Sequence, residues 1–216
     1  MTISNVKSNK RKISIALVLV ISILVFGAVG YAAIQNNNVA RLLGIEQAKV
    51  LSSVGNDIVA TIDGEKITIE GFDTYKLFLN SSEGNKLSDQ QILDKILDRQ
   101  VVYKQAIKEG MTASEEEVNL AIKSAQEAVE LDSKQYEAFK EYISGLKLSE
   151  DEYWESVKPA YKKALTCGKY KNVLKEKYKE ENNIQDAKEL NSKFIDFYNQ
   201  KVKELKSNIK VESFLK

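Results

Sequence analysis

Residues 58–70 read IVATIDGEKITIE. Two runs rich in β-branched residues flank the dipeptide Asp63-Gly64, and β-branched side chains favour strands. An Asp-Gly pair supplies the positive φ angles that a two-residue type I′ turn requires. The stretch therefore predicts a β-hairpin, and it is the one strong strand signal in the sequence.

The residues after the hairpin have the apolar spacing of helices, so the predicted fold class is mainly α. Ser88, Ser114 and Ser149 are placed to cap three helices, because a serine hydroxyl accepts a free backbone N–H at a helix start. Further helices are expected through Phe72 to Phe78, from Ser133 to a stop at Gly145, and from Ile184 to Leu205.

The helix that begins after Ser149 is expected to be the longest, reaching about residue 180. Pro159 lies inside it and removes one backbone donor, which predicts a kink near residues 155–159. At the end of the chain, Ile209, Val211 and Ser213 alternate. They predict a short closing strand after the returning C-terminal helix.

The N-terminal region contains a long apolar run. Ile13 to Ile34 reads ISIALVLVISILVFGAVGYAAI, 22 residues without a charge, and a helix of that length rises about 33 Å, enough to span a bilayer core. Lys7, Lys10, Arg11 and Lys12 precede it, which predicts a cytoplasmic N-terminus and an extracytoplasmic body. The small residues around Gly30 leave open a cleaved signal and a secreted body.

These features divide the chain into four segments. We expect a basic cytoplasmic tip (1–12), a transmembrane anchor or signal (13–34), a stalk with a short helix (35–56) and one folded domain (57–216). From residue 34 onward there are 28 basic and 31 acidic residues, so no basic footprint for nucleic acid is expected. The lysines from 162 to 179 are interpreted as a solvated helix face.

The composition excludes the commonest catalytic sites. The chain has no histidine and one cysteine, Cys167, so Ser-His and Cys-His catalysis, disulfides and cysteine zinc sites are excluded. The sequence also lacks a phosphate-binding glycine loop. We therefore expect no enzyme activity, no catalytic residue, no cofactor and no metal. Cys167 is interpreted as a small buried apolar residue.

Three segments in order resemble the N-terminal domain of the SurA/PrsA-type chaperones. They are IVATIDGEKITIEGF (58–72), ILDKILDRQVVYKQAIKEGMTASEEEVNLAI (92–122) and LSEDEYWESVKPAYKKAL (148–165). The resemblance implies an exported, chaperone-like domain that holds unfolded or secreted polypeptides. Members of the family often carry a parvulin isomerase domain between the long helix and the returning one. Here only residues 180–183 separate the two, so the resemblance implies no isomerase activity.

Aromatic residues at helical spacing are the candidate peptide-binding side chains, since each offers a large apolar face. The alternative is that they form an ordinary core. Because adjacent residues on a helix point about 100° apart, one of the Tyr153–Trp154 pair is expected to be partly exposed. A second possible function is a docking module for one fixed partner in the cell envelope. The candidate residues are Phe72, Tyr75, Tyr136, Phe139, Tyr142, Tyr153, Trp154 and Tyr161.

Overall fold

The computed structural model describes residues 37–52, 57–83 and 87–215. The predicted anchor or signal, residues 13–34, lies outside them. Among the residues that are described, none of the helices combines the length and the apolar character needed to cross a membrane.

The predicted hairpin is present. Strand β1 (Ile58–Ile62) pairs antiparallel with β2 (Glu65–Thr68). Asp63 and Gly64 at the turn have φ angles of 49° and 80°, which are the positive values expected of a type I′ turn. The predicted closing strand is also present. Strand β3 (Val211–Ser213) pairs antiparallel with the other edge of β1, giving the sheet order β2-β1-β3.

The rest of the described chain is helical, as predicted. Ser88, Ser114 and Ser149 each form a complete capping box with the residue three positions later. The last helix begins at Ala187 instead of Ile184, because the Asp186 carboxylate caps it. The helices are α3 (Asn37–Ser52), α4 (Ile69–Glu83), α5 (Asp89–Lys108), α6 (Glu115–Glu130), α7 (Ser133–Leu146), α8 (Glu150–Glu181) and α9 (Ala187–Ser207).

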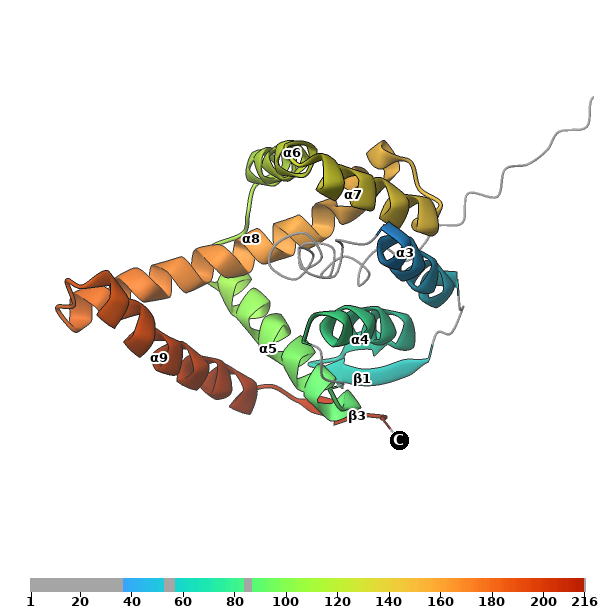
Figure 1. Ribbon diagram of the computed structural model, residues 1–216. Coiled ribbons are helices and arrows are strands. Elements are labelled where there is room, and N and C mark those ends of the chain that lie inside the picture. The colour runs from blue at the N-terminus through green and yellow to red at the C-terminus, as the bar shows by residue number, and fades with distance from the viewer. Residues whose placement is uncertain (1–36, 53–56, 84–86, 216) are drawn as a thin grey trace, which may run out of the picture.

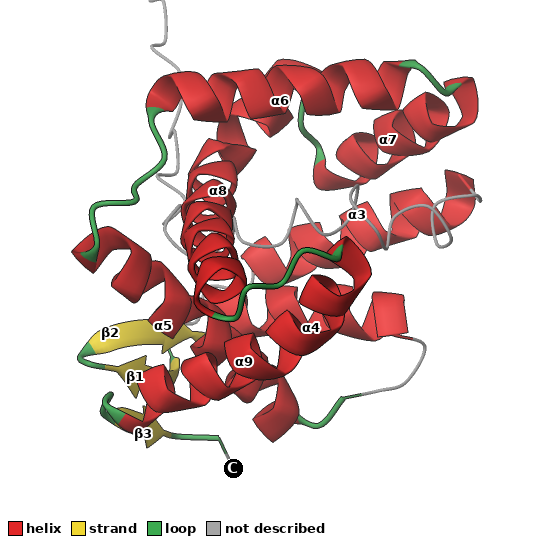
Figure 2. Ribbon diagram, turned by 90° about the vertical axis from the view of Figure 1, so that its left-hand side faces the viewer, coloured by secondary structure: helices red, strands yellow, loops and turns green. Residues whose placement is uncertain are grey.

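The long helix α8 organises the arrangement (Figure 1). It contacts α5, α6, α7 and α9. The chain turns at the far end of α8 and returns as α9, which crosses α5 before it reaches β3 beside the hairpin. Figure 2 shows the three strands together at one side of the molecule, with α9 leading into β3. The helix α8 remains continuous through Pro159, and the predicted kink stays a prediction.

Two groups of buried side chains hold these elements together. The larger joins the hairpin to α4, α5, α6, α7 and the start of α8. The smaller joins the second half of α5 to α8 and α9 through Val101, Val102, Ala106, Tyr170 and Val202. The smaller core therefore fixes the returning helix against the body.

Helix α3 lies within residues 35–56, the expected stalk, and it packs against α7. Ala40, Gly44 and Gln47 are buried on the face that meets α7. Gly145 was predicted to end α7, but it lies inside the helix, which runs to Leu146 and ends at Lys147 with a φ of 61°. Gly145 instead lets the α3 backbone approach closely, and a Cβ there would lie 2.9 Å from the backbone nitrogen of Ile45.

The crossing of α3 and α7 generates a stability prediction. A Cβ at Gly44 would overlap the carbonyl oxygen of Tyr142, and one at Gly145 would overlap that of Arg41. Because neither neighbour is a flexible side chain, Gly44→Ala and Gly145→Ala should each lower the free energy of unfolding by about 1–3 kcal/mol. The measurement is urea unfolding followed by fluorescence of Trp154, the chain's single tryptophan.

Gly168→Ala is the matched control. Gly168 also lies inside a helix, but a Cβ there meets no atom within 4 Å. This substitution should raise stability by about 0.5–1 kcal/mol, since alanine is the better helix former. Equal effects at all three glycines would show that close backbone approach is not what these positions require.

Candidate functional site

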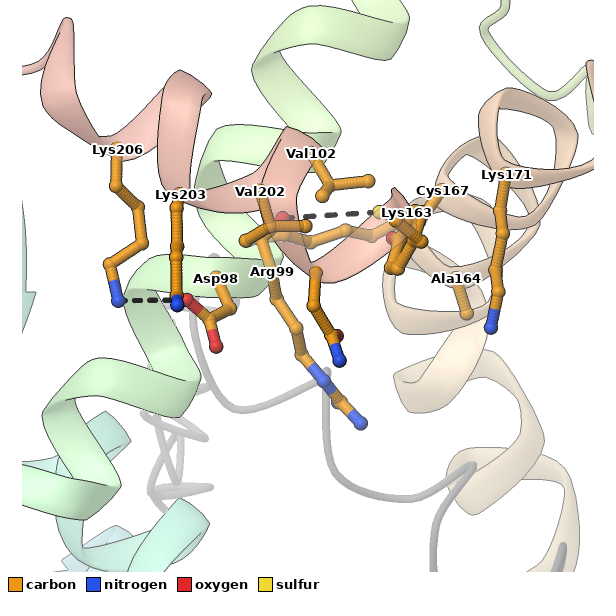
Figure 3. A pocket seen from close by; sticks show the side chains of 12 residues that line it. Asp98, Arg99, Val102, Lys163, Ala164, Cys167, Lys171, Val202, Lys203 and Lys206 are labelled. Atoms are coloured by element: carbon orange, nitrogen blue, oxygen red, sulfur yellow. Dashed lines mark hydrogen bonds and ion pairs between the residues drawn. The ribbon is translucent and has the colours of Figure 1, made fainter. Parts of the chain in front are cut away.

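A pocket of about 680 Å³ lies where α5, α8 and α9 meet. Figure 3 shows side chains from all three helices converging on it. Its apolar lining includes Val102, Ala164 and Val202, and its polar lining is dominated by cations. The cationic residues are Arg99, Lys163, Lys171, Lys203 and Lys206, and the lining carboxylate is Asp98. Cys167, Tyr198 and Asn199 complete the lining.

The apolar part of the pocket is continuous with the smaller core. Val102 and Val202 are both buried members of that core. Ala164 is exposed in the turn of α8 that faces the pocket. Val102 and Val202 therefore form the floor of the pocket, fixed by the packing of α5 against α9, and Ala164 offers exposed aliphatic surface beside them.

The cations at the rim differ in their partners. The Nζ atom of Lys206 lies 2.8 Å from a carboxylate oxygen of Asp98 and 3.8 Å from one of Asp94. Lys171 lies over the ring of Tyr198, 5.0 Å from its centroid. Lys203 is exposed. The positive charge of Lys206 is thus balanced by α5, and that of Lys171 rests on an aromatic face.

Lys163 lies deeper and belongs to a polar network. Its Nζ donates to the side-chain oxygen of Gln100, and the Gln100 amide donates in turn to the carboxylate of Glu65. The amine also lies 5.1 Å from the centroid of the Tyr103 ring. Burial lowers the pKa of Lys163 from its ordinary value of 10.5, because the charged form loses solvation. The network links β2, α5 and α8.

Cys167 borders the pocket as a half-buried residue with a free thiol. Its Sγ atom lies 3.9 Å from the carbonyl oxygen of Arg99. Burial raises the pKa of this thiol, so the thiolate needed for nucleophilic chemistry is disfavoured. Within the described ranges there is also no cluster of side chains suited to hold a metal ion.

The structure places the predicted aromatic residues away from this pocket, since none of the eight lines it. Tyr136 and Tyr161 are half-buried, and the Tyr136 hydroxyl lies 3.2 Å from a carboxylate oxygen of Glu150. Their role in binding a peptide stays a prediction. Six of the eight are buried in the larger core, namely Phe72, Tyr75, Phe139, Tyr142, Tyr153 and Trp154.

The expectation that one of Tyr153 and Trp154 is partly exposed is wrong. Their exposed fractions are 2% and 4%. The Phe139 ring lies 5.2 Å from that of Tyr153 and 5.3 Å from that of Trp154. The Tyr142 ring, also on α7, lies 6.1 Å from that of Tyr153, so both neighbouring directions on this turn of α8 are covered and both rings are buried.

Comparison with known proteins gives the family. Residues 2–163 match the SurA-like N-terminal domain. The chain belongs to this family. It is similar to a protein named "Foldase protein PrsA" from Clostridium perfringens (strain SM101 / Type A), at 27% identity over 169 residues. That match covers 70% of this chain and 44% of the relative, so the chain spans less than half the relative's length. No solved structure matches the chain.

Sequence reasoning missed the pocket of this SurA-like domain, although a weak signal existed. Lys163, Cys167 and Lys171 recur every four residues on α8, and Tyr198 and Val202 do so on α9, so each set shares one helix face. Nothing in that spacing indicates that the two faces meet across α5.

Two lysines of α8 that were interpreted as part of a solvated face form ion pairs with another helix. Lys162 and Lys169 reach Glu115 and Glu117 of α6, at 3.1 and 2.9 Å.

The lowered pKa of Lys163 predicts how the stability of this SurA-like domain depends on pH. Because the pKa of Lys163 is lower in the folded chain than in the unfolded one, the unfolded state binds more protons between the two values. The contribution of Lys163 to stability should therefore rise with pH as the pH approaches 10.5. The measurement is the unfolding free energy of the native chain and of Lys163→Gln from about pH 8 to 10. The value for the native chain minus that for the variant should increase with pH. A constant difference would contradict it.

Proposed function

We propose that this SurA-like domain is a chaperone-like module that binds unfolded or secreted polypeptides reversibly. The observation that carries the proposal is the mixed apolar and cationic pocket in a domain of this family. A flexible chain offers both apolar and charged side chains, and a recess with both kinds of surface suits short segments of many sequences. The relative's printed name, a foldase, agrees with this role.

The binding needs no covalent chemistry. An apolar client side chain that buried about 100 Å² against Val102, Ala164 and Val202 would gain about 2.5 kcal/mol. Ordering the client segment opposes part of that gain. Weak and reversible binding follows, as a module that releases its clients requires.

Filling the pocket is the direct test of the proposal. Ala164 is exposed and lines the pocket, so Ala164→Trp should occupy the client's place while leaving the core intact. The native full-length chain should suppress the light scattering of an aggregating unfolded protein at near-stoichiometric ratio. Ala164→Trp should lose most of this effect.

Ala128→Trp is the matched control, because Ala128 is an exposed helical alanine on α6 outside the pocket. It should suppress aggregation as the native chain does. A native chain without any suppression would contradict the proposed function, and equal loss in both variants would contradict the pocket as its place. Capture of one stoichiometric partner instead of many clients would favour the docking module.

We also propose that residues 13–34 anchor the chain in the cell membrane, with the body outside the cytoplasm. The uncharged run and the basic residues before it support this topology. The mass of the chain recovered from a membrane fraction should correspond to an intact N-terminus. A chain cleaved near Gly30 and found in the medium would establish the alternative, a secreted protein.

Prolyl isomerase activity is not part of the proposed function. The chain contains no histidine, and α8 ends at Glu181 only a few residues before α9 begins at Ala187. A tetrapeptide isomerisation assay should therefore show the uncatalysed rate. A clear acceleration by the purified chain would contradict this part of the proposal.

A further inference from the structure

We propose that the pocket between α5, α8 and α9 selects polypeptide segments in which carboxylates flank an apolar side chain. This inference rests on the proposed function and adds a client class to it. The apolar side chain would lie against Val102 and Val202, and the flanking carboxylates would reach Lys171 and Lys203 on opposite helices.

The charge of the pocket is the first support. Five of its lining residues are cationic and one is a carboxylate. That single carboxylate, Asp98, is already engaged by Lys206. In the part of the chain that the structure describes, Lys171 and Lys203 make no ion pair. A ligand with two carboxylates would supply the missing charge on both sides of the pocket.

Several lysines of α8 and α9 outside the pocket are paired with carboxylates. Lys162 and Lys169 of α8 each pair with a glutamate of α6, and Lys193 of α9 pairs with Glu189 at 2.8 Å. From residue 34 onward the chain carries more acidic than basic residues. The cations of the pocket are therefore a local concentration within a near-neutral body, and not part of a general basic surface.

The depth of the pocket adds a second support. Lys163 lies behind the rim, and its nearest hydrogen-bond acceptor is the neutral amide oxygen of Gln100. Glu65 lies beyond Gln100 and offsets part of the charge. Charges in a partly dehydrated recess interact more strongly than the same charges in open solvent. A carboxylate at the mouth of the pocket would therefore be attracted electrostatically by Lys163 as well as by Lys171 and Lys203.

The shape of the site favours a polypeptide over other anions. The cations surround aliphatic surface in a recess between three helices, which accepts side chains from a flexible chain. A bilayer would contact a convex surface, and a nucleic acid would follow a longer basic track. An acidic segment with one apolar residue matches both the charge and the lining.

The experiment compares two peptides that differ only in charge. Each is about ten residues long and carries a neutral dye, with a central leucine flanked by two glutamates in one peptide and by two glutamines in its twin. Fluorescence anisotropy measures their binding to the full-length chain in phosphatidylcholine nanodiscs. The acidic peptide should bind about three- to tenfold more tightly than its twin at low salt. Raising the salt to about 0.5 M should remove most of the difference.

Variants locate the effect. Lys171→Gln with Lys203→Gln should abolish the preference, so that the acidic peptide binds no more tightly than its glutamine twin, and because both lysines are exposed the fold should be retained. Lys171→Arg with Lys203→Arg should retain the preference, since the charges remain. Lys177→Gln with Lys188→Gln is the matched control, because these lysines lie exposed on the same two helices outside the pocket. That control should keep the full preference.

The outcomes separate this inference from the function on which it rests. Binding of neither peptide would overturn both. Equal binding of the two peptides would overturn the client class and leave polypeptide binding standing. An equal loss of preference in the Lys177/Lys188 control would also overturn it, by showing a general charge effect. Vesicles of phosphatidylglycerol that bind the native chain and not the Lys171/Lys203 variant, with no peptide preference, would assign the pocket to a lipid headgroup instead.

Discussion

The pairing of β3 with β1 is the interaction on which the rest of the architecture depends. It ties the end of the described chain to the hairpin, and so requires α9 to return along α5. The turn residue Asp63 holds the junction, since its backbone N–H donates to the carbonyl oxygen of Lys210 at 2.8 Å, and its carboxylate accepts from the Lys210 N–H at 2.9 Å. The second of these bonds lowers the pKa of Asp63. Without this closure the C-terminal end of α9 would lose its tie to the sheet, and the wall that α9 gives the pocket would rest on the smaller core and on the Lys206 ion pairs with α5.

The local parts of the fold could be predicted from the sequence because their causes are local. An Asp-Gly pair between β-branched runs defines its turn wherever it occurs, and a serine three residues before a glutamate or glutamine caps a helix by its own hydrogen bonds. Gly145 was misinterpreted for the opposite reason. A glycine near a helix end usually stops the helix, and only the approach of α3, about a hundred residues earlier, shows that this one serves packing.

The candidate site was less predictable, and the aromatic residues explain why. Their spacing on α4, α7 and α8 is equally typical of a core and of a binding face, and the decision depends on which helices cover them. Both Tyr153 and Trp154 are buried, and both pack against Phe139 of α7. The pocket itself is assembled from a few residues of each of three helices, and none of these sets forms a recognisable motif in its own segment. Arg99, Lys163 and Lys203 are too far apart in the chain to form a sequence motif. They come together as one positively charged site only because α9 packs across α5.

The order in which this sheet is completed has a consequence for the folding of the newly made chain. Thr61 and Glu212, whose side chains lie 3.4 Å apart across the β1–β3 pair, are 151 positions apart in the chain. The hairpin joins neighbouring residues and can form as soon as they are made, but one edge of β1 has no partner until residues 211–213 are present. An unpaired strand edge is a template for association with other chains, and long-range pairing is slow to form. A nascent copy of this protein would thus pass through a stage that resembles the unfinished polypeptides it is proposed to hold.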